Sequence, residues 1–199
     1  MRLLVATTNP GKIGEYQALL DGLNLQVVGL RQVEIDFDVE ETGASFEENA
    51  PIKARAYADA SGLLTLADDS GLCVDALDGA PGIYSARYGP TEHARIERLL
   101  GELQGVPDER RTARFGCVVA LAEPGAAIWT FEGVCEGRIA WQPSGTNGFG
   151  YDPVFLFPEY GQTMAELPAA VKNQVSHRAR AMTKAREWLL ARTSARGAR

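Results

Sequence analysis

The sequence is poor in cysteine and histidine, and it has no long apolar run. Its 199 residues include three cysteines and two histidines, without the close spacing of a zinc site or a disulfide framework. We therefore expect reduced, buried thiols. No apolar run approaches the roughly 20 residues that cross a bilayer, and the first six residues are too short for a signal-peptide core. These absences predict a cytoplasmic protein that binds no membrane.

Positive charge is also scarce, with 20 Lys and Arg against 26 Asp and Glu. Phosphate backbones demand clustered positive charge, so this chain is a poor candidate for a nucleic-acid binder. A small anionic substrate is not excluded, because local charge can oppose the total. The composition is otherwise typical of a globular protein. We expect residues 1–191 to form a single domain of two lobes, and the Arg-rich residues 192–199 to form a disordered tail.

Hydrophobic periodicity predicts strands and helices that alternate at both ends of the chain, with a hairpin between them. One predicted helix begins with a capping box formed by Ser45 and Glu48 and ends at Gly62, and Pro51 predicts a kink or a delayed start in it. Another predicted helix is capped by Ser176. The fold class is therefore α/β, an elongated mixed sheet flanked by helices around a central cleft. The predicted strands are residues 2–6, 25–29, 63–67, 72–76, 112–122 and 127–140, with an acidic turn between 63–67 and 72–76.

A polar loop, residues 7–12, joins the first predicted strand to the first helix. Backbone N–H groups at a helix N-terminus bind phosphate well, and Lys12 adds a mobile ammonium group. The spacing is not that of a Walker loop, since Ile13 follows the lysine. An ordinary strand-to-helix turn is the alternative interpretation.

Two acidic segments could bind a metal ion or a proton. Asp68 and Asp69 follow an apolar strand, and adjacent carboxylates are tolerated more easily beside a cation; a solvated acidic turn is the alternative. Residues 34–48 carry seven acids and no base, and their carboxylates are hard oxygen ligands of the kind that Mg²⁺ prefers. Asn49 and Lys53 lie four residues apart and share a helix face, where a surface pair is the alternative.

Two further segments suggest recognition of a planar base. Residues 145–153 place Phe149 among glycines, which let the backbone approach a ligand closely, and an aromatic face can stack on a base. A loop whose aromatics fill the core is the alternative. Near the C-terminus, His177 and Arg178 follow the predicted cap Ser176, at a helix end that disfavours cations. An Arg at that end indicates an anionic or carbonyl-bearing partner.

These segments, in this order, resemble the non-canonical purine nucleoside triphosphate pyrophosphatases, also called dITP/XTP or inosine triphosphate pyrophosphatases. The resemblance covers nearly the whole chain, and Pro51, where an aliphatic residue is more usual, is the one departure. Its most specific parts are TTNPGKIGE (residues 7–15), EETGASFEENAPIKA (40–54), ADDSGL (67–72), GAPGIYSARYG (79–89), GFGYDP (148–153) and SHR (176–178).

The resemblance implies a homodimeric, Mg²⁺-dependent hydrolase of nucleotide metabolism. It would split ITP, dITP and XTP into the monophosphate and pyrophosphate, and so remove them from the nucleotide pool. Glu40 would bind the metal with Asp69, although Glu41 is open as the ligand. Asp69 would also accept a proton from water, with Lys53 as the second catalytic residue. The remaining substrate contacts would come from Thr7, Thr8, Asn9, Pro10, Gly11, Lys12 and Ser70 for the phosphates, and from Phe149, Gly150, Tyr151, Asp152, Lys172, His177 and Arg178 for the base.

Donor and acceptor chemistry accounts for the implied choice of base. Arg178 can only donate hydrogen bonds, and position 6 of hypoxanthine or xanthine is an acceptor, whereas adenine carries a donor there. An unpaired buried donor costs roughly 1–3 kcal/mol. Two other hypotheses are a regulatory module that binds a purine nucleotide without hydrolysing it, and a metal-dependent phosphatase for another metabolite. The adjacent acids argue against the first, and the aromatic loop argues against the second.

Overall fold

The computed structural model describes the backbone of residues 1–197 and the side chains of residues 1–192. Its longer elements alternate between strand and helix at both ends of the chain, as periodicity predicted. The strands are β1 (Arg2–Val5), β2 (Gln26–Gly29), β3 (Leu64–Val74), β4 (Thr112–Ala122), β5 (Ile128–Ile139), β6 (Phe155–Phe157) and β7 (Gln162–Thr163), and the α-helices are α1 (Pro10–Leu19), α2 (Phe46–Ser61), α3 (Glu92–Glu102), α4 (Ala169–Val175) and α5 (His177–Gly197).

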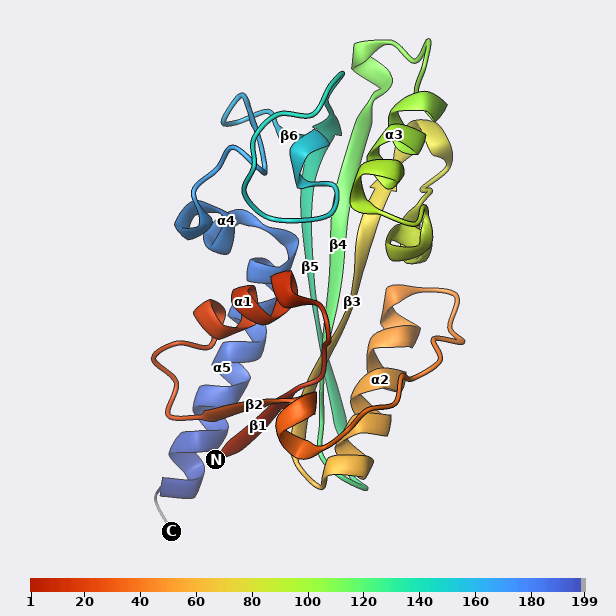
Figure 1. Cartoon of the computed structure of the whole chain (residues 1–199). Coiled ribbons are helices and arrows are strands. Elements are labelled where there is room, and N and C mark those ends of the chain that lie inside the picture. The colour runs from red at the N-terminus through yellow and green to blue at the C-terminus, as the bar shows by residue number, and fades with distance from the viewer. Residues whose placement is uncertain (198–199) are drawn as a thin grey trace. The chain divides into compact units, whose positions relative to one another are not determined.

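The strands form one sheet in the order β2-β1-β3-β4-β5-β6-β7. β1 pairs in parallel with β2 and β3, whereas β6 pairs antiparallel with β5 and β7. The sheet is therefore mixed and carries helices (Figure 1), which confirms the predicted α/β class. Among the residues described, no helix is both long and apolar enough to cross a membrane.

The chain divides into two compact units, where the sequence predicted one domain of two lobes. Unit 1 comprises Met1–Asp69, Cys117–Gly133 and the chain from Arg178, and unit 2 comprises Ser70–Gly116 and Val134–His177. Strands β3, β4 and β5 contribute residues to both units. Each unit has its own hydrophobic core.

In unit 1 the helices cover both faces of the sheet, with α1 and α5 on one side of β1 and α2 on the other (Figure 1). One core cluster joins Leu3, Leu66 and Cys117 to side chains of α1 and α5, such as Tyr16 and Met182. A second cluster joins alternate strand residues to Ala50, Ala54 and Tyr57 of α2. Because successive strand residues point to opposite faces, each strand of this unit contributes side chains to both clusters.

Unit 2 has a single cluster in which α3 and the aromatic residues of the sheet pack together. Leu99 and Leu103 meet Phe115 and Phe155 there, and the two phenylalanine rings lie 4.7 Å apart between centroids. The glycine-rich segment after β5 leads into Tyr151, which is buried and donates a hydrogen bond to the carbonyl of Ser85 at 3.0 Å. The segment that sequence analysis assigned to base recognition is thus fixed to the core of this unit.

Several local predictions are confirmed, and others need correction. Ser45 caps α2, which Gly62 ends in a left-handed conformation, and α2 continues through Pro51 without a delayed start. The predicted acidic turn at Asp68 is wrong, because β3 is continuous from Leu64 to Val74. The short helix α4 was not predicted. α5 continues through residues 192–197, where composition predicted a disordered tail, and residues 198–199 lie outside the described residues.

Candidate functional site

The loop between β1 and α1 is organised by its own side chains. Asn9 is the N-cap of α1, and its Oδ1 accepts hydrogen bonds from the backbone N–H groups of Gly11 (2.9 Å) and Lys12 (3.2 Å). Pro10 occupies the first turn, where its missing N–H is not needed. Thr7 Oγ1 accepts from the N–H of Asn9 at 3.2 Å. The loop therefore presents a fixed helix N-terminus, as an anion site requires.

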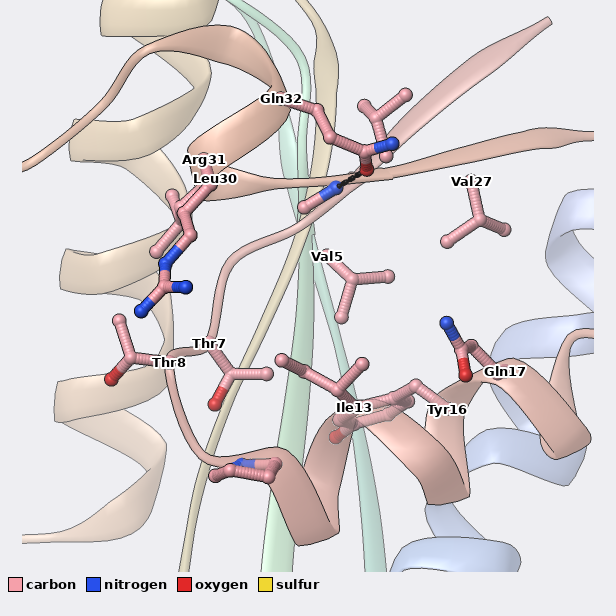
Figure 2. A pocket seen from close by; sticks show the side chains of 13 residues that line it. Val5, Thr7, Thr8, Ile13, Tyr16, Gln17, Val27, Leu30, Arg31 and Gln32 are labelled. Carbon is pink, nitrogen blue, oxygen red and sulfur yellow. Dashed lines mark hydrogen bonds between the residues drawn. The ribbon is translucent and has the colours of Figure 1, made fainter.

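A cavity of about 340 Å³ lies beside this loop within unit 1 (Figure 2). Val5, Ile13 and Val27 give it an apolar wall, and the guanidinium of Arg31 points toward Thr7 and Thr8 (Figure 2). Sequence analysis missed Arg31, because no local pattern relates the end of β2 to the loop after β1. The cation stands beside two of the predicted phosphate ligands. The full lining consists of Val5, Thr7, Thr8, Pro10, Ile13, Tyr16, Gln17, Val27, Val28, Gly29, Leu30, Arg31 and Gln32.

Asp68 points to the side of β3 that carries α1 and α5. Its Oδ2 accepts from Lys12 Nζ at 2.9 Å and from Arg178 Nη2 at 3.2 Å, and the Cys117 thiol lies 3.8 Å away. Burial alone raises a carboxyl pKa, but the charges of Lys12 and Arg178 outweigh it and hold the pKa of Asp68 well below its usual range. Asp68 is therefore a buried carboxylate that stays ionised.

Asp69 points to the opposite side of the strand, toward α2. Its Oδ2 accepts from Asn49 Nδ2 at 3.1 Å, and its Oδ1 lies 3.5 Å from Lys53 Nζ. Burial raises the pKa of Asp69, and the negative charge of Glu41 adds to that effect, while Lys53 and Asn49 oppose it. The net shift is upward, so Asp69 holds a proton more readily than an exposed aspartate does.

Lys53 joins Asp69 to the acidic segment before α2. Its Nζ donates to Glu41 Oε1 at 2.7 Å, whereas Glu40 is exposed. Although burial works in the other direction, the charge of Asp69 and the other acids nearby raises the pKa of Lys53. Of the two glutamates that sequence analysis left open as metal ligands, Glu41 is the one that shares a partner with Asp69.

The chemistry of these carboxylates fits a magnesium ion. The described residues contain no group of three or more His, Cys, Asp or Glu side chains that could hold a metal by themselves. Mg²⁺ is commonly held by one or two carboxylates together with waters and substrate phosphates. Asp69 and Glu41, both within reach of the Lys53 ammonium group, supply that number of oxygen donors.

In unit 2, a buried acid and a buried lysine lie beside an aromatic ring. Lys172 Nζ donates to Asp152 Oδ2, which also accepts from the N–H of Phe149 at 2.8 Å. The same ammonium group lies 4.8 Å from the centroid of the Phe149 ring. A Cβ at Gly148, where φ is +75°, would collide with the Asp152 carboxylate. The glycine therefore lets this loop close around Asp152, and three predicted base ligands are brought together.

His177 is also buried in unit 2, at the start of α5. Its ring stacks on Phe115 with centroids 4.7 Å apart and an interplanar angle of 14°, and its Nδ1 lies 3.9 Å from Cys135 Sγ. Ser176, which ends α4, is buried beside it. The three cysteines of the chain, all within the described residues, are free thiols as expected, and Cys117 and Cys135 are buried, but Cys73 is only partly buried.

The predicted site residues thus form two groups, one in each unit. In unit 1, Lys12 pairs with Asp68 on one face of β3, and Lys53 pairs with Asp69 on the other. In unit 2, Phe149, Asp152 and Lys172 are linked, and Ser70 begins the part of β3 that belongs to this unit. Arg178 belongs to unit 1, where its Nη1 donates to Glu15 Oε2 at 2.5 Å. Its predicted contact with a base stays a prediction.

Comparison with known proteins gives consistent matches over most of the chain. Residues 3–188 match the model of the Ham1 family. A protein of Shouchella clausii called dITP/XTP pyrophosphatase is 51% identical over 190 residues, 94% of this chain and 96% of its own length. One of the same name from Halalkalibacterium halodurans is 50% identical over 94% of this chain and 97% of its own. The solved HAM1 protein of Coxiella burnetii is 42% identical with a TM-score of 0.87, covering 96% of this chain and 99% of that one.

Proposed function

This chain belongs to the Ham1 family, and we propose that it hydrolyses ITP, dITP and XTP to the monophosphate and pyrophosphate. The observation that carries the proposal is the buried carboxylate of Asp69 on β3, which accepts a hydrogen bond from Asn49 and lies 3.5 Å from the Lys53 ammonium group that also contacts Glu41. A fixed carboxylate beside a cation and a second acid can accept a proton or help to hold a metal ion. The names of the relatives point to the same substrates.

Binding of the triphosphate falls to unit 1. The N-terminus of α1, fixed by Asn9, offers backbone N–H groups, and Lys12 and Lys53 supply positive charge on the two faces of β3. Pyrophosphate carries more negative charge as it leaves, and fixed cations in a partly buried site stabilise that charge without reorganising. We assign Thr7 and Thr8 of unit 1 to hydrogen bonds with phosphate oxygens, and also Ser70, the first residue of unit 2, as the resemblance implies.

Asp69 accepts the proton of the attacking water. The hydrogen bond from Asn49 at 3.1 Å holds its carboxylate in one orientation, and general-base catalysis requires a base in a fixed position. Lys53 lies 3.5 Å away and keeps the carboxylate ionised until the proton is transferred. Water loses its proton to Asp69, its oxygen adds to phosphorus, and the bond between the α and β phosphates breaks.

We propose Mg²⁺ as the cofactor, held by Asp69 and Glu41. When bound, Mg²⁺ supplies charge neutralisation of the phosphate oxygens and orientation of the water. The role of Lys53 is then to hold the two carboxylates near each other, since its ammonium group contacts both. Two carboxylates facing each other without a cation repel, and Lys53 relieves that repulsion.

Recognition of the base falls to unit 2. The face of Phe149 can stack on a purine, and Lys172, held by Asp152, can donate a hydrogen bond to a keto oxygen. Adenine presents an amino donor at the same position, and a donor facing Lys172 would stay unpaired at a cost of roughly 1–3 kcal/mol. We assign Gly150 and Tyr151 to backbone contacts with the base and His177 to a side-chain contact with it.

The remaining parts of the proposal concern the assembly and its location. We propose a homodimer in the cytoplasm that binds neither nucleic acid nor membrane. The net charge of −6 argues against a phosphate backbone as partner. Light scattering of the purified protein tests the dimer, with the monomer mass of 21.5 kDa as the reference.

The function is tested by incubating the purified protein with Mg²⁺ and, separately, with ITP, XTP, ATP and GTP. Identification of the products by ion-exchange chromatography distinguishes pyrophosphate from orthophosphate. We expect the monophosphate and pyrophosphate from ITP and XTP, at rates at least about 10-fold above those for ATP. Release of orthophosphate, or equal rates with ATP, would contradict the proposal. A reaction in excess chelator is the control for the metal.

A further inference from the structure

Four charged side chains of unit 1 form a continuous chain of ion pairs. Glu15 accepts from Arg178 Nη1 at 2.5 Å, Arg178 Nη2 donates to Asp68 at 3.2 Å, and Asp68 accepts from Lys12 Nζ at 2.9 Å. Lys12 and Glu15 lie one turn apart on α1, Asp68 is on β3, and Arg178 is in the first turn of α5. Negative and positive side chains alternate along this series of ion pairs, so each carboxylate contacts a cation.

The paired side chains differ in how deeply they are buried. The side chains of Arg178 and Asp68 are 2% and 1% exposed, whereas that of Lys12 is 17% exposed. The ion pairs are therefore buried at Asp68 and Arg178 and become partly exposed at both ends, at Lys12 and at Glu15, whose side chain is 11% exposed. A buried carboxylate without a cation is strongly unfavourable, so Asp68 keeps its partners, and Lys12 is the partner that a solute can reach.

The location of Arg178 needs a physical reason, because a cation in the first turn of a helix is disfavoured by the helix dipole. The carboxylates of Glu15 and Asp68 provide it. A planar guanidinium can donate to two carboxylates at once in a fixed geometry, and here it ties α1 and β3 to the start of α5. Its centre also lies 5.7 Å from the Tyr16 ring centroid. An anionic ligand is not required to explain the arginine.

We propose that Asp68 and Arg178 are positioning residues for Lys12. A lysine has a long, flexible stem and a point charge that can take many orientations. Asp68 selects one of them, and Arg178 with Glu15 fixes Asp68. Pre-positioning lowers the entropic cost of placing the ammonium group against a phosphate. The inference rests on the proposed function in one respect, namely that Lys12 contacts the phosphates of the substrate.

A double-mutant cycle tests the link between Asp68 and Lys12. Asp68→Asn, Lys12→Ala and the double variant are compared in KM for ITP and in the dissociation constant of inorganic pyrophosphate, measured by calorimetry. We expect Asp68→Asn to weaken pyrophosphate binding and raise KM about tenfold in the wild-type background, and to change both less than twofold once Lys12 is absent. Additive effects would overturn the proposal, because Asp68 would then act independently of Lys12.

Glu15→Gln and Arg178→Lys test the outer part of the chain of ion pairs. Both are expected to weaken pyrophosphate binding about threefold and to leave the ratio of kcat/KM for ITP and ATP unchanged. A changed ratio with unchanged pyrophosphate binding would assign Arg178 to the base instead. Asp59→Asn is the control, since Asp59 is an acid of unit 1 whose side chain is 49% exposed and pairs with Arg55. It should alter neither quantity.

The proposal can still be tested if Asp68→Asn does not fold or if the protein does not hydrolyse ITP. If Asp68→Asn fails to fold, as circular dichroism would reveal, Glu15→Gln combined with Lys12→Ala gives the same cycle at a less buried position. If the wild-type protein leaves ITP and XTP intact, the proposed function fails. The pyrophosphate cycle would still support or overturn the positioning of Lys12, since it needs no turnover.

Discussion

The two faces of strand β3 carry adjacent aspartates in opposite electrostatic environments. On the face of α1 and α5, Asp68 meets Lys12 and Arg178, and its pKa is lowered. On the face of α2, Asp69 meets Asn49 and Lys53 beside Glu41, and its pKa is raised by burial and by that second acid. One peptide bond separates the two carboxyl groups, but the alternation of a strand sends them into different surroundings.

This difference shows how a single strand can supply two unlike functions. The carboxylate with two cations keeps its charge and serves as an anchor, while the one with an acidic neighbour can exchange a proton or bind a cation. A turn at this point, as sequence analysis predicted, would have exposed both acids to the same solvent. Continuous strand geometry is what separates them.

The largest expected effect comes from removing the carboxylate on the α2 face. Asp69→Asn keeps the size of the side chain but can neither accept the proton of water nor bind a cation with full charge. We expect kcat with ITP to fall about 10²–10⁴-fold, the usual contribution of a general base. Equilibrium binding of ITP in chelator should stay within about threefold. A near-normal kcat would remove Asp69 from the catalytic role.

On the other face, the expected effect is mainly on stability. Asp68→Asn leaves Lys12 and Arg178 without their shared carboxylate, and breaking a buried ion pair from one side costs about 3–5 kcal/mol. Urea unfolding at pH 7, monitored by circular dichroism, measures the loss. Asp69→Asn should be at least as stable as the wild type in the same assay, because the raised pKa of Asp69 means that its charged form is disfavoured in the folded state.

The stability of the two asparagine variants relative to the wild type should depend on pH in opposite directions. The folded-state pKa of Asp68 lies well below the usual range of an aspartate. The stabilisation by its charge is therefore complete above the pKa of the unfolded chain, about 4, and is lost as the pH falls further. The deficit of Asp68→Asn should shrink below about pH 4. Asp69 has a raised pKa in the folded state, so the advantage of Asp69→Asn should be constant above that pKa and should shrink as the pH falls below it. Parallel trends for both variants would contradict the contrast.

A smaller effect distinguishes the two glutamates beside the α2 face. Glu41→Gln removes the carboxylate that contacts Lys53, and we expect the Mg²⁺ concentration for half-maximal rate to rise about tenfold, since carboxylate charge governs affinity at such sites. Glu40→Gln is the matched variant, with the same charge change at an exposed neighbour. It should shift that concentration less than twofold. The reverse order would make Glu40 the ligand.

Sequence analysis was most successful where the signals are local. The Ser45 cap, the Gly62 stop, the strand before the loop at residues 7–12 and the hairpin of β4 and β5 all follow from patterns within a few residues. It failed at Asp68 because consecutive acids usually mark solvent, and the partners that permit burial lie 56 and 110 residues away in the chain. Those contacts, like the pairing of Arg178 with Glu15, have no signature in either segment alone.

The same limit applies to α4 and to the choice between Glu40 and Glu41. α4 has seven residues and no side-chain cap, so neither length nor a capping pattern identifies it. Glu40 and Glu41 are adjacent residues of the same type, and the contact of Glu41 with Lys53 depends on how the acidic segment approaches α2. The fold, and not the local sequence, therefore decides which of the two glutamates meets the lysine.

The smallest predicted effect comes from removing the N-cap of α2, the helix on the Asp69 face of β3. Ser45 Oγ accepts from the N–H of Glu48 at 3.3 Å, and the next turn of α2 holds the acidic segment, since Asn49 Oδ1 accepts from the N–H of Gly43 at 2.8 Å. Ser45→Ala should lower the free energy of unfolding by about 1 kcal/mol.

Ser45 caps α2, the helix on the Asp69 face of β3, so the two faces should respond differently to Ser45→Ala. The Mg²⁺ concentration for half-maximal rate should rise about twofold, because the segment that bears Glu41 is less firmly held against α2. Pyrophosphate binding in chelator, which reports Lys12, should not change. Ser45→Thr keeps an acceptor oxygen and is the control for both measurements. An equal loss in both would mean that the faces are coupled through β3, and the separation of roles between Asp68 and Asp69 would then be incomplete.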